Sequence, residues 1–111
     1  MINVITSLDN FDTNQVPTMP ECENYIKALA VEIYENHNEL LKENGIRWHS
    51  KNQAIGSTML TFKDIYVEHG FHGICDVKLH HVLTEHLTKI HMLFQQIAAL
   101  YCYARKIKIY H

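Results

Sequence analysis

The sequence predicts an all-α protein, a three-helix or four-helix bundle with a short ordered N-terminal arm. Apolar residues recur at the i, i+3, i+4, i+7 spacing over long stretches. Helix-capping signals precede two of these stretches. The chain has 111 residues with only 4 Gly and 2 Pro, and most of these lie between the stretches. We therefore expect one domain, residues 1–111, with an arm over 1–17 and a helical bundle over 18–111.

The first helix is expected over residues 19–44. Thr18 and Glu21 have the spacing of a capping box, and Pro20 falls in the first turn, where its missing N–H does no harm. Gly45 marks the end. Four glutamates, at positions 32, 35, 39 and 43, share the outer side. The predicted buried face consists of Ile26, Leu29, Ala30, Ile33, His37, Leu40 and Leu41.

The second helix is expected over residues 51–69. Ser50 and Gln53 form a second capping pattern, and Gly70 is the predicted stop. Its predicted buried face consists of Ile55, Met59, Phe62, Tyr66 and His69.

The third helix is expected from about residue 76 to 106. Its predicted buried face consists of Leu79, Leu83, Leu87, Ile90, Phe94, Ile97, Ala98, Tyr101 and Ala104. Other apolar side chains lie outside this face, so the helix is apolar over more of its circumference than two neighbours can cover. This excess predicts a homodimer or partner surface. The candidate partner-binding residues are Met92, Leu100 and Tyr103, with Lys89, Arg105 and Lys106 as rim charges.

Charge is distributed unevenly along the chain. Residues 1–46 hold eight acidic and two basic residues, whereas residues 47–111 hold four and eight, giving −6 and +4 with the histidines neutral. Two explanations are open: complementarity between antiparallel helices, or a polarised surface for a partner with an acidic face. The net charge of −2 provides no overall attraction to nucleic acid or to a membrane.

The ends and the cysteines indicate a reducing compartment. The three cysteines are an odd number and widely spread, which does not fit a disulfide framework. The first residues, "MINVITSLDNFD", lack the basic start of a secretory signal. No apolar run has the length of a membrane span. We expect a cytoplasmic protein.

Six of the nine histidines lie between His69 and His91. Within a continuous 76–106 helix no two histidines are three or four residues apart, and His80 and His91 would stand about 16 Å apart. We therefore expect no metal. The alternative is a zinc site in the preceding turn, formed by His69, His72 and Cys75 with His80 as a fourth ligand, because imidazole and thiolate suit zinc.

The sequence contains no GxSxG, no Gly-rich phosphate loop and no HExxH, so an enzyme is not favoured. We expect a small binding protein of inhibitor, immunity, adaptor or regulatory type that acts through protein–protein contacts. Zinc binding is the alternative above. A third reading is RNA binding by the basic end "YARKIKIYH". There Arg105 and His111 resemble the R-x4–6-H motif of HEPN ribonucleases, and this resemblance of two residues implies an RNA-cleaving helical bundle.

Overall fold

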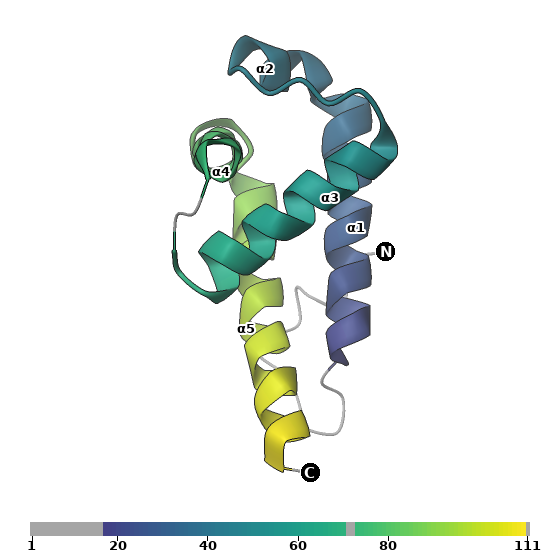
Figure 1. The fold of residues 1–111 in the computed structure, drawn as a ribbon, viewed down its shortest axis with the longest axis vertical. Helices are drawn as coiled ribbons and strands as arrows, with labels where there is room; N and C mark the ends of the chain where they lie inside the picture. Colours follow the sequence, from purple (N-terminus) through teal and green to yellow (C-terminus); the bar gives the residue numbers. More distant parts are fainter. Residues whose placement is uncertain (1–16, 71–72, 111) are drawn as a thin grey trace.

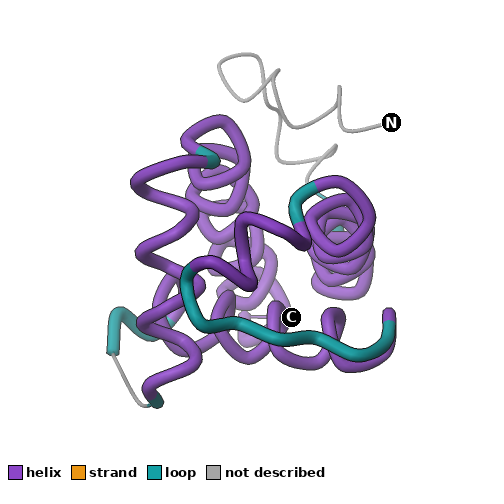
Figure 2. Tube along the Cα trace, turned by 90° about the horizontal axis from the view of Figure 1, so that it is seen from above, coloured by secondary structure: helices purple, strands orange, loops and turns teal. Residues whose placement is uncertain are grey.

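The computed structural model describes residues 17–70 and 73–110, with the side chains of Cys75 and residues 107–110 outside the description. Every element in these ranges is helical, which confirms the all-α prediction, and Figure 2 shows helices and loops alone there. The predicted arm falls in residues 1–16, outside the described residues. The elements are α1 (Met19–Asn36), α2 (Asn38–Glu43), α3 (Lys51–Thr61), the π-helical segment η3 (Phe62–Val67), α4 (Ile74–His86) and α5 (Thr88–Tyr110).

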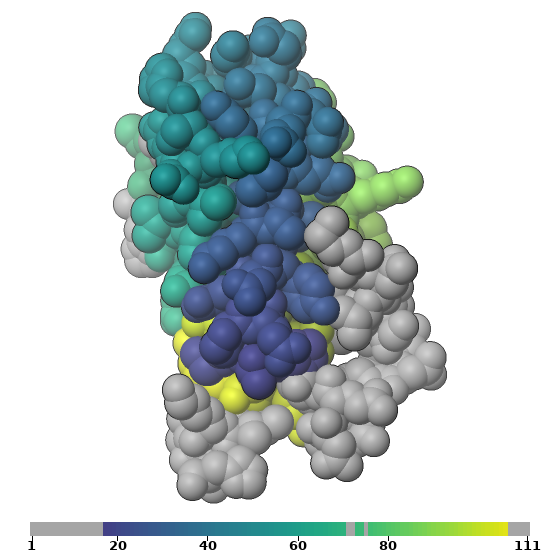
Figure 3. Space-filling view, turned by 90° about the vertical axis from the view of Figure 1, so that its right-hand side faces the viewer, coloured from purple at the N-terminus to yellow at the C-terminus, as the bar shows by residue number. Residues whose placement is uncertain are grey.

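Two long helices form the frame of the molecule. α1 and α5 run along the long axis in opposite directions and contact each other, as Figure 1 shows. α3 crosses them diagonally and packs mainly on α1 and α4. Figure 3 shows α1 on the outer face, with α3 beside it and the C-terminal part of α5 visible below.

The first predicted helix is interrupted, which corrects the expected span of 19–44. Its start is as predicted: the Thr18 side chain accepts from the Glu21 N–H, and the Glu21 carboxylate accepts from the Thr18 N–H at 3.2 Å. At His37 the backbone turns to φ −130° and ψ 19°, and α2 begins directly after it. Asn on either side of His37 favours helix ends over helix interiors, which explains the position of the break. His37 is thus a half-buried junction residue.

The third predicted helix is also interrupted, at Leu87, where φ is −122° and ψ is 53°. α4 is seen end-on in Figure 1, whereas α5 runs along the long axis, so the chain turns sharply there. A continuous helix over 76–106 would be about 46 Å long, while the 18 residues of α1 cover only about 27 Å. The turn lets α4 pack on α3 and η3. Leu87 is consequently only partly buried, and its predicted place deep in the core is wrong.

The second predicted helix forms without a break, but its second part, η3, is π-helical instead of α-helical. The Ser50 side chain caps it by accepting from the Gln53 N–H at 3.1 Å, while the Gln53 side chain accepts from the N–H of His49. Of its predicted buried face, Phe62 and Tyr66 are buried as expected, whereas Ile55 and Met59 are only partly buried and His69 is exposed. The α3 residues that the core encloses are Ala54, Thr58 and Thr61.

The core joins all the long elements. On α1 it contains Ile26, Leu29, Ala30 and Ile33, as the periodicity predicts, together with Cys22. Phe62 of η3 fills the centre, with its ring edge-to-face against Phe94 at 6.2 Å and Tyr101 at 5.7 Å between ring centroids. Because α5 contacts α1, α4 and η3, these neighbours cover part of the apolar circumference that predicted a partner surface.

Candidate functional site

A cavity of about 420 Å³ lies beside η3, at the place where η3, α4 and α5 meet. It combines an apolar wall with imidazole, phenol, amide and thiol groups. Such a mixture of shape and polar groups is typical of ligand-binding or regulatory sites. The lining residues are Ile65, Tyr66, His69, His80, His91, Gln95, Ala98, Ala99 and Cys102.

The polar centre of this cavity is a hydrogen-bonded set of three side chains, the Tyr66–His80–His91 cluster. The Tyr66 hydroxyl lies 2.7 Å from Nδ1 of His91 and 3.2 Å from Nδ1 of His80. The short distance fits an O–H donor, so we infer that Tyr66 donates to His91 and accepts from the Nδ1–H of His80. Each of η3, α4 and α5 thus contributes one member to a single chain of hydrogen bonds.

The three rings also pack against one another. The centroid of Tyr66 lies 5.5 Å from that of His80 and 5.5 Å from that of His91, and the two imidazoles are 5.6 Å apart. Phe94 also packs edge-to-face against Tyr66, with its centroid 5.2 Å from that of Tyr66. These separations are in the favourable range for aromatic pairs, so the cluster contributes to packing as well as to hydrogen bonding.

Burial sets the protonation of the cluster. Desolvation lowers the pKa of His80, and the neighbouring His91 and His81 lower it further. Desolvation also lowers the pKa of His91, and it raises the pKa of the Tyr66 phenol. All three groups are therefore neutral at pH 7, the state that the inferred hydrogen-bond pattern requires.

Unusual backbone surrounds this cluster. The π-helical turns of η3 place Tyr66 in the core, where it is 7% exposed. Just beyond η3, His69 adopts φ 59°, so this residue, and not the predicted Gly70, takes the left-handed conformation that ends the helix. π-helical segments and non-glycine residues with positive φ cost energy and are concentrated at functional sites. Both features adjoin the cavity.

The sequence-based separation of His80 and His91 proved wrong. It assumed one straight helix, along which eleven residues span about 16 Å. The turn at Leu87 folds α4 back, so that the two imidazoles meet across the α4–α5 junction. Among the candidate signals in the sequence, only the density of histidines between residues 69 and 91 pointed to this region.

The alternative zinc site is brought together only in part. His69 and His80 line the same cavity, but His72 and the side chain of Cys75 lie outside the described residues. Among the described residues, no three His, Cys, Asp or Glu side chains are arranged to hold a metal ion. The zinc site remains a prediction, as does the RNA-binding end, whose His111 is also outside the description.

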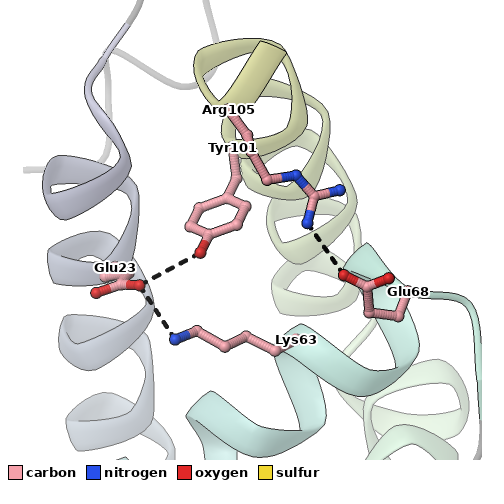
Figure 4. Close-up of polar contacts among 5 residues, drawn as sticks. All are labelled: Glu23, Lys63, Glu68, Tyr101 and Arg105. Carbon is pink, nitrogen blue, oxygen red and sulfur yellow. Dashed lines mark hydrogen bonds and ion pairs between the residues drawn. The ribbon is translucent and has the colours of Figure 1, made fainter. Parts of the chain in front are cut away.

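A second polar cluster ties η3 to the two long helices, as Figure 4 shows. Lys63 Nζ lies 3.2 Å from Oε2 of Glu23, and the Tyr101 hydroxyl donates to the same carboxylate at 3.5 Å. On the other side of η3, Arg105 Nη1 donates to Oε1 of Glu68 at 3.0 Å. Because both ion pairs are exposed, solvent screens them and each contributes little to stability. Together they orient the π-helical segment between α1 and α5.

The predicted partner-binding residues of α5 differ in how exposed they are. Met92 is 56% exposed, and Lys89 and Lys106 are exposed as expected. Leu100 is only 4% exposed, so placing it on the surface was wrong: it belongs to the core. Tyr103 is partly buried and engaged within the chain, and Arg105 pairs with Glu68.

A different apolar surface is exposed at the corner where α3 ends and α4 begins. Leu60, Ile74 and Val77 are 60%, 76% and 43% exposed, and we call these three residues the α3–α4 corner. The two helices are joined beneath it, because the Thr61 hydroxyl lies 3.1 Å from Oδ1 of Asp76 in a buried contact. The i, i+3 spacing of Ile74 and Val77 was the sequence signal for this face, and it was overlooked.

Comparison of the chain with protein-family models, curated proteins and solved structures finds no match in any of the three. Within the described residues, no helix combines the length and the hydropathy that crossing a bilayer would need.

Proposed function

We propose that this protein is a small cytoplasmic binding protein, without catalytic activity, that acts through protein–protein contacts as an inhibitor, immunity, adaptor or regulatory protein. The observation that carries the proposal is the α3–α4 corner. Three large apolar side chains are exposed on two helices that pack against each other, and exposed apolar groups of this kind are typical of interaction surfaces.

The rigidity of the corner supports this role. Thr61 and Asp76 hold the end of α3 against the start of α4, so the corner is held in place before a partner arrives. A surface that is already ordered loses less conformational entropy on binding than a mobile one. The apolar side chains can therefore contribute most of their burial energy to association.

The partner proposed first is a second copy of this chain. The halves of the sequence carry −6 and +4, so the acidic part of one copy can face the basic part of another. Exposed glutamates at positions 32, 35, 39 and 43 lie along α1 and α2, and Lys78 is exposed beside Val77 on α4. Two copies thus offer an exposed apolar surface together with regions of opposite charge.

Sedimentation equilibrium over a range of protein concentrations tests the proposal. The wild type should form a dimer that raised salt weakens. Ile74→Glu should be monomeric with unchanged circular dichroism, because Ile74 is exposed and its loss does not affect the core. Met92→Glu is the matched control: it puts the same charge at an exposed apolar position of α5 and should leave the dimer intact.

Two results would contradict this proposal. A wild type that stays monomeric at the highest soluble concentration would exclude self-association. Dissociation by Met92→Glu, with Ile74→Glu still dimeric, would place the interface on α5 and remove the role assigned to the corner.

A further inference from the structure

We propose that the Tyr66–His80–His91 cluster is a pH-sensitive contact that holds α4 on η3 and α5 when both imidazoles are neutral and releases it when they are protonated. As a property of the fold, it can be tested on the isolated protein.

Protonation of His91 removes a hydrogen-bond acceptor from the cluster. The observed pattern needs an acceptor nitrogen on His91, 2.7 Å from the Tyr66 hydroxyl. When His91 is protonated, both of its ring nitrogens carry hydrogen and neither can accept. The Tyr66 proton then loses its partner in a largely buried position, which is costly.

Repulsion between the two protonated imidazoles also favours the release of α4. Protonation of both residues puts two cations into rings whose centroids are 5.6 Å apart. Within the part of the chain that the structure describes, the titratable groups that face them include Tyr66 from η3, His69 beyond η3, Cys102 from α5 and His81 on α4 itself. Among the described residues that line the cavity, none is a carboxylate that could offset the added charge.

The direction of the response follows from linkage. Burial keeps the pKa of His80 and His91 below the ordinary value of 6.5 while α4 is in place. When α4 moves away, the rings enter water and their pKa values rise toward that value. The open form therefore binds more protons than the closed form, and acidification below about pH 6.5 favours opening.

The backbone at Leu87 provides the point of movement. The Leu87 N–H is shared between the carbonyl oxygens of Val82 at 3.3 Å and Leu83 at 3.2 Å, and the helical backbone ends at this residue. At the other end, the Thr61–Asp76 contact keeps α4 on α3. Opening should therefore move the C-terminal half of α4, while its N-terminal end stays on α3.

Hydrogen exchange measured by mass spectrometry between about pH 7.5 and 5 tests the inference, after correction for the intrinsic pH dependence of exchange. Protection of the peptide over 77–86 should fall by up to about tenfold per pH unit for each proton taken up, with α1 still protected. His80→Asn combined with His91→Asn should remove this pH dependence, because Asn can replace a ring nitrogen as a hydrogen-bonding group but does not titrate. His86→Asn, at an exposed position on the same helix, should behave as the wild type.

A measurement on the wild type alone keeps the test decisive if the double variant does not fold. The ring protons of His80 and His91, followed by NMR, should titrate over the same pH range in which protection of α4 falls. Loss of protection in α1 together with α4 would indicate global unfolding and overturn the inference. So would unchanged α4 protection after both rings have become protonated. These results do not depend on dimer formation, so they can be distinguished from a failure of the proposed function.

Discussion

Thr58 and Thr61 lie on the same buried face of α3, one turn apart, and both are 0% exposed. Their hydroxyls differ in hydrogen bonding: that of Thr61 lies 3.0 Å from the Ser57 carbonyl oxygen and 3.1 Å from Oδ1 of Asp76. In contrast, the Thr58 hydroxyl has no hydrogen-bond partner within the described residues. Valine has nearly the same shape as threonine and a similar helix propensity. Thr→Val therefore isolates the contribution of each hydroxyl.

The two substitutions should change stability in opposite directions. Thr61→Val removes a hydrogen bond to a buried carboxyl group and should lower the free energy of unfolding by about 1.5–3 kcal/mol. In a domain of this size that corresponds to a fall in Tm on the order of 10 °C. Thr58→Val removes an unsatisfied polar group and should raise the free energy of unfolding by about 1 kcal/mol.

Thermal and urea unfolding, followed by circular dichroism, measures both effects. The helical signal of the folded state should be the same for the two variants and the wild type. Equal shifts of the same sign would refute the reasoning, because they would mean that the hydrogen bond between Thr61 and Asp76 contributes nothing to joining α3 and α4.

Three further outcomes are expected. Leu83→Ala should lower the free energy of unfolding by about 2–5 kcal/mol and Leu87→Ala by less, since Leu83 is fully buried and Leu87 only partly; urea titration would show an equal loss if the helix break is misplaced. Stability should fall as the pH drops below about 6.5, because burial lowers the pKa of His80 and His91 in the folded state; a flat profile of Tm against pH would contradict this. Cys22 should resist alkylation until urea is added, since burial, with smaller effects from two neighbouring glutamates, raises its pKa to about 11; mass spectrometry of the native protein would reveal any rapid labelling.

Local signals predicted where α1 and α3 begin. The capping residues Thr18 and Ser50 act on the backbone within three residues of themselves, so their effect can be read directly from the chain. Gly45 adopts φ 84° just beyond α2, as a glycine at a helix end should. The buried face of α1 was also correct, because a helix packed along most of its length must repeat apolar residues at the helical period.

The candidate site was harder to predict. His80 and His91 are eleven residues apart, and the chain between them contains neither Gly nor Pro to mark a break. The apolar period continues through Leu87, so a straight helix explained the pattern equally well. The exposed α3–α4 corner was missed for a related reason, because exposure of Ile74 depends on where α4 packs.

The sequence by itself determined that this chain forms helices, where α1 and α3 begin, and which face of α1 is buried, because capping and amphipathic periodicity act over a few residues. Only the tertiary structure decided where the long helices turn, because the turns at His37 and Leu87 bury more apolar surface than straight helices would. The turn at Leu87 also decided the site: it brings His80 and His91 to the hydroxyl of Tyr66, a contact between three elements that no local pattern encodes.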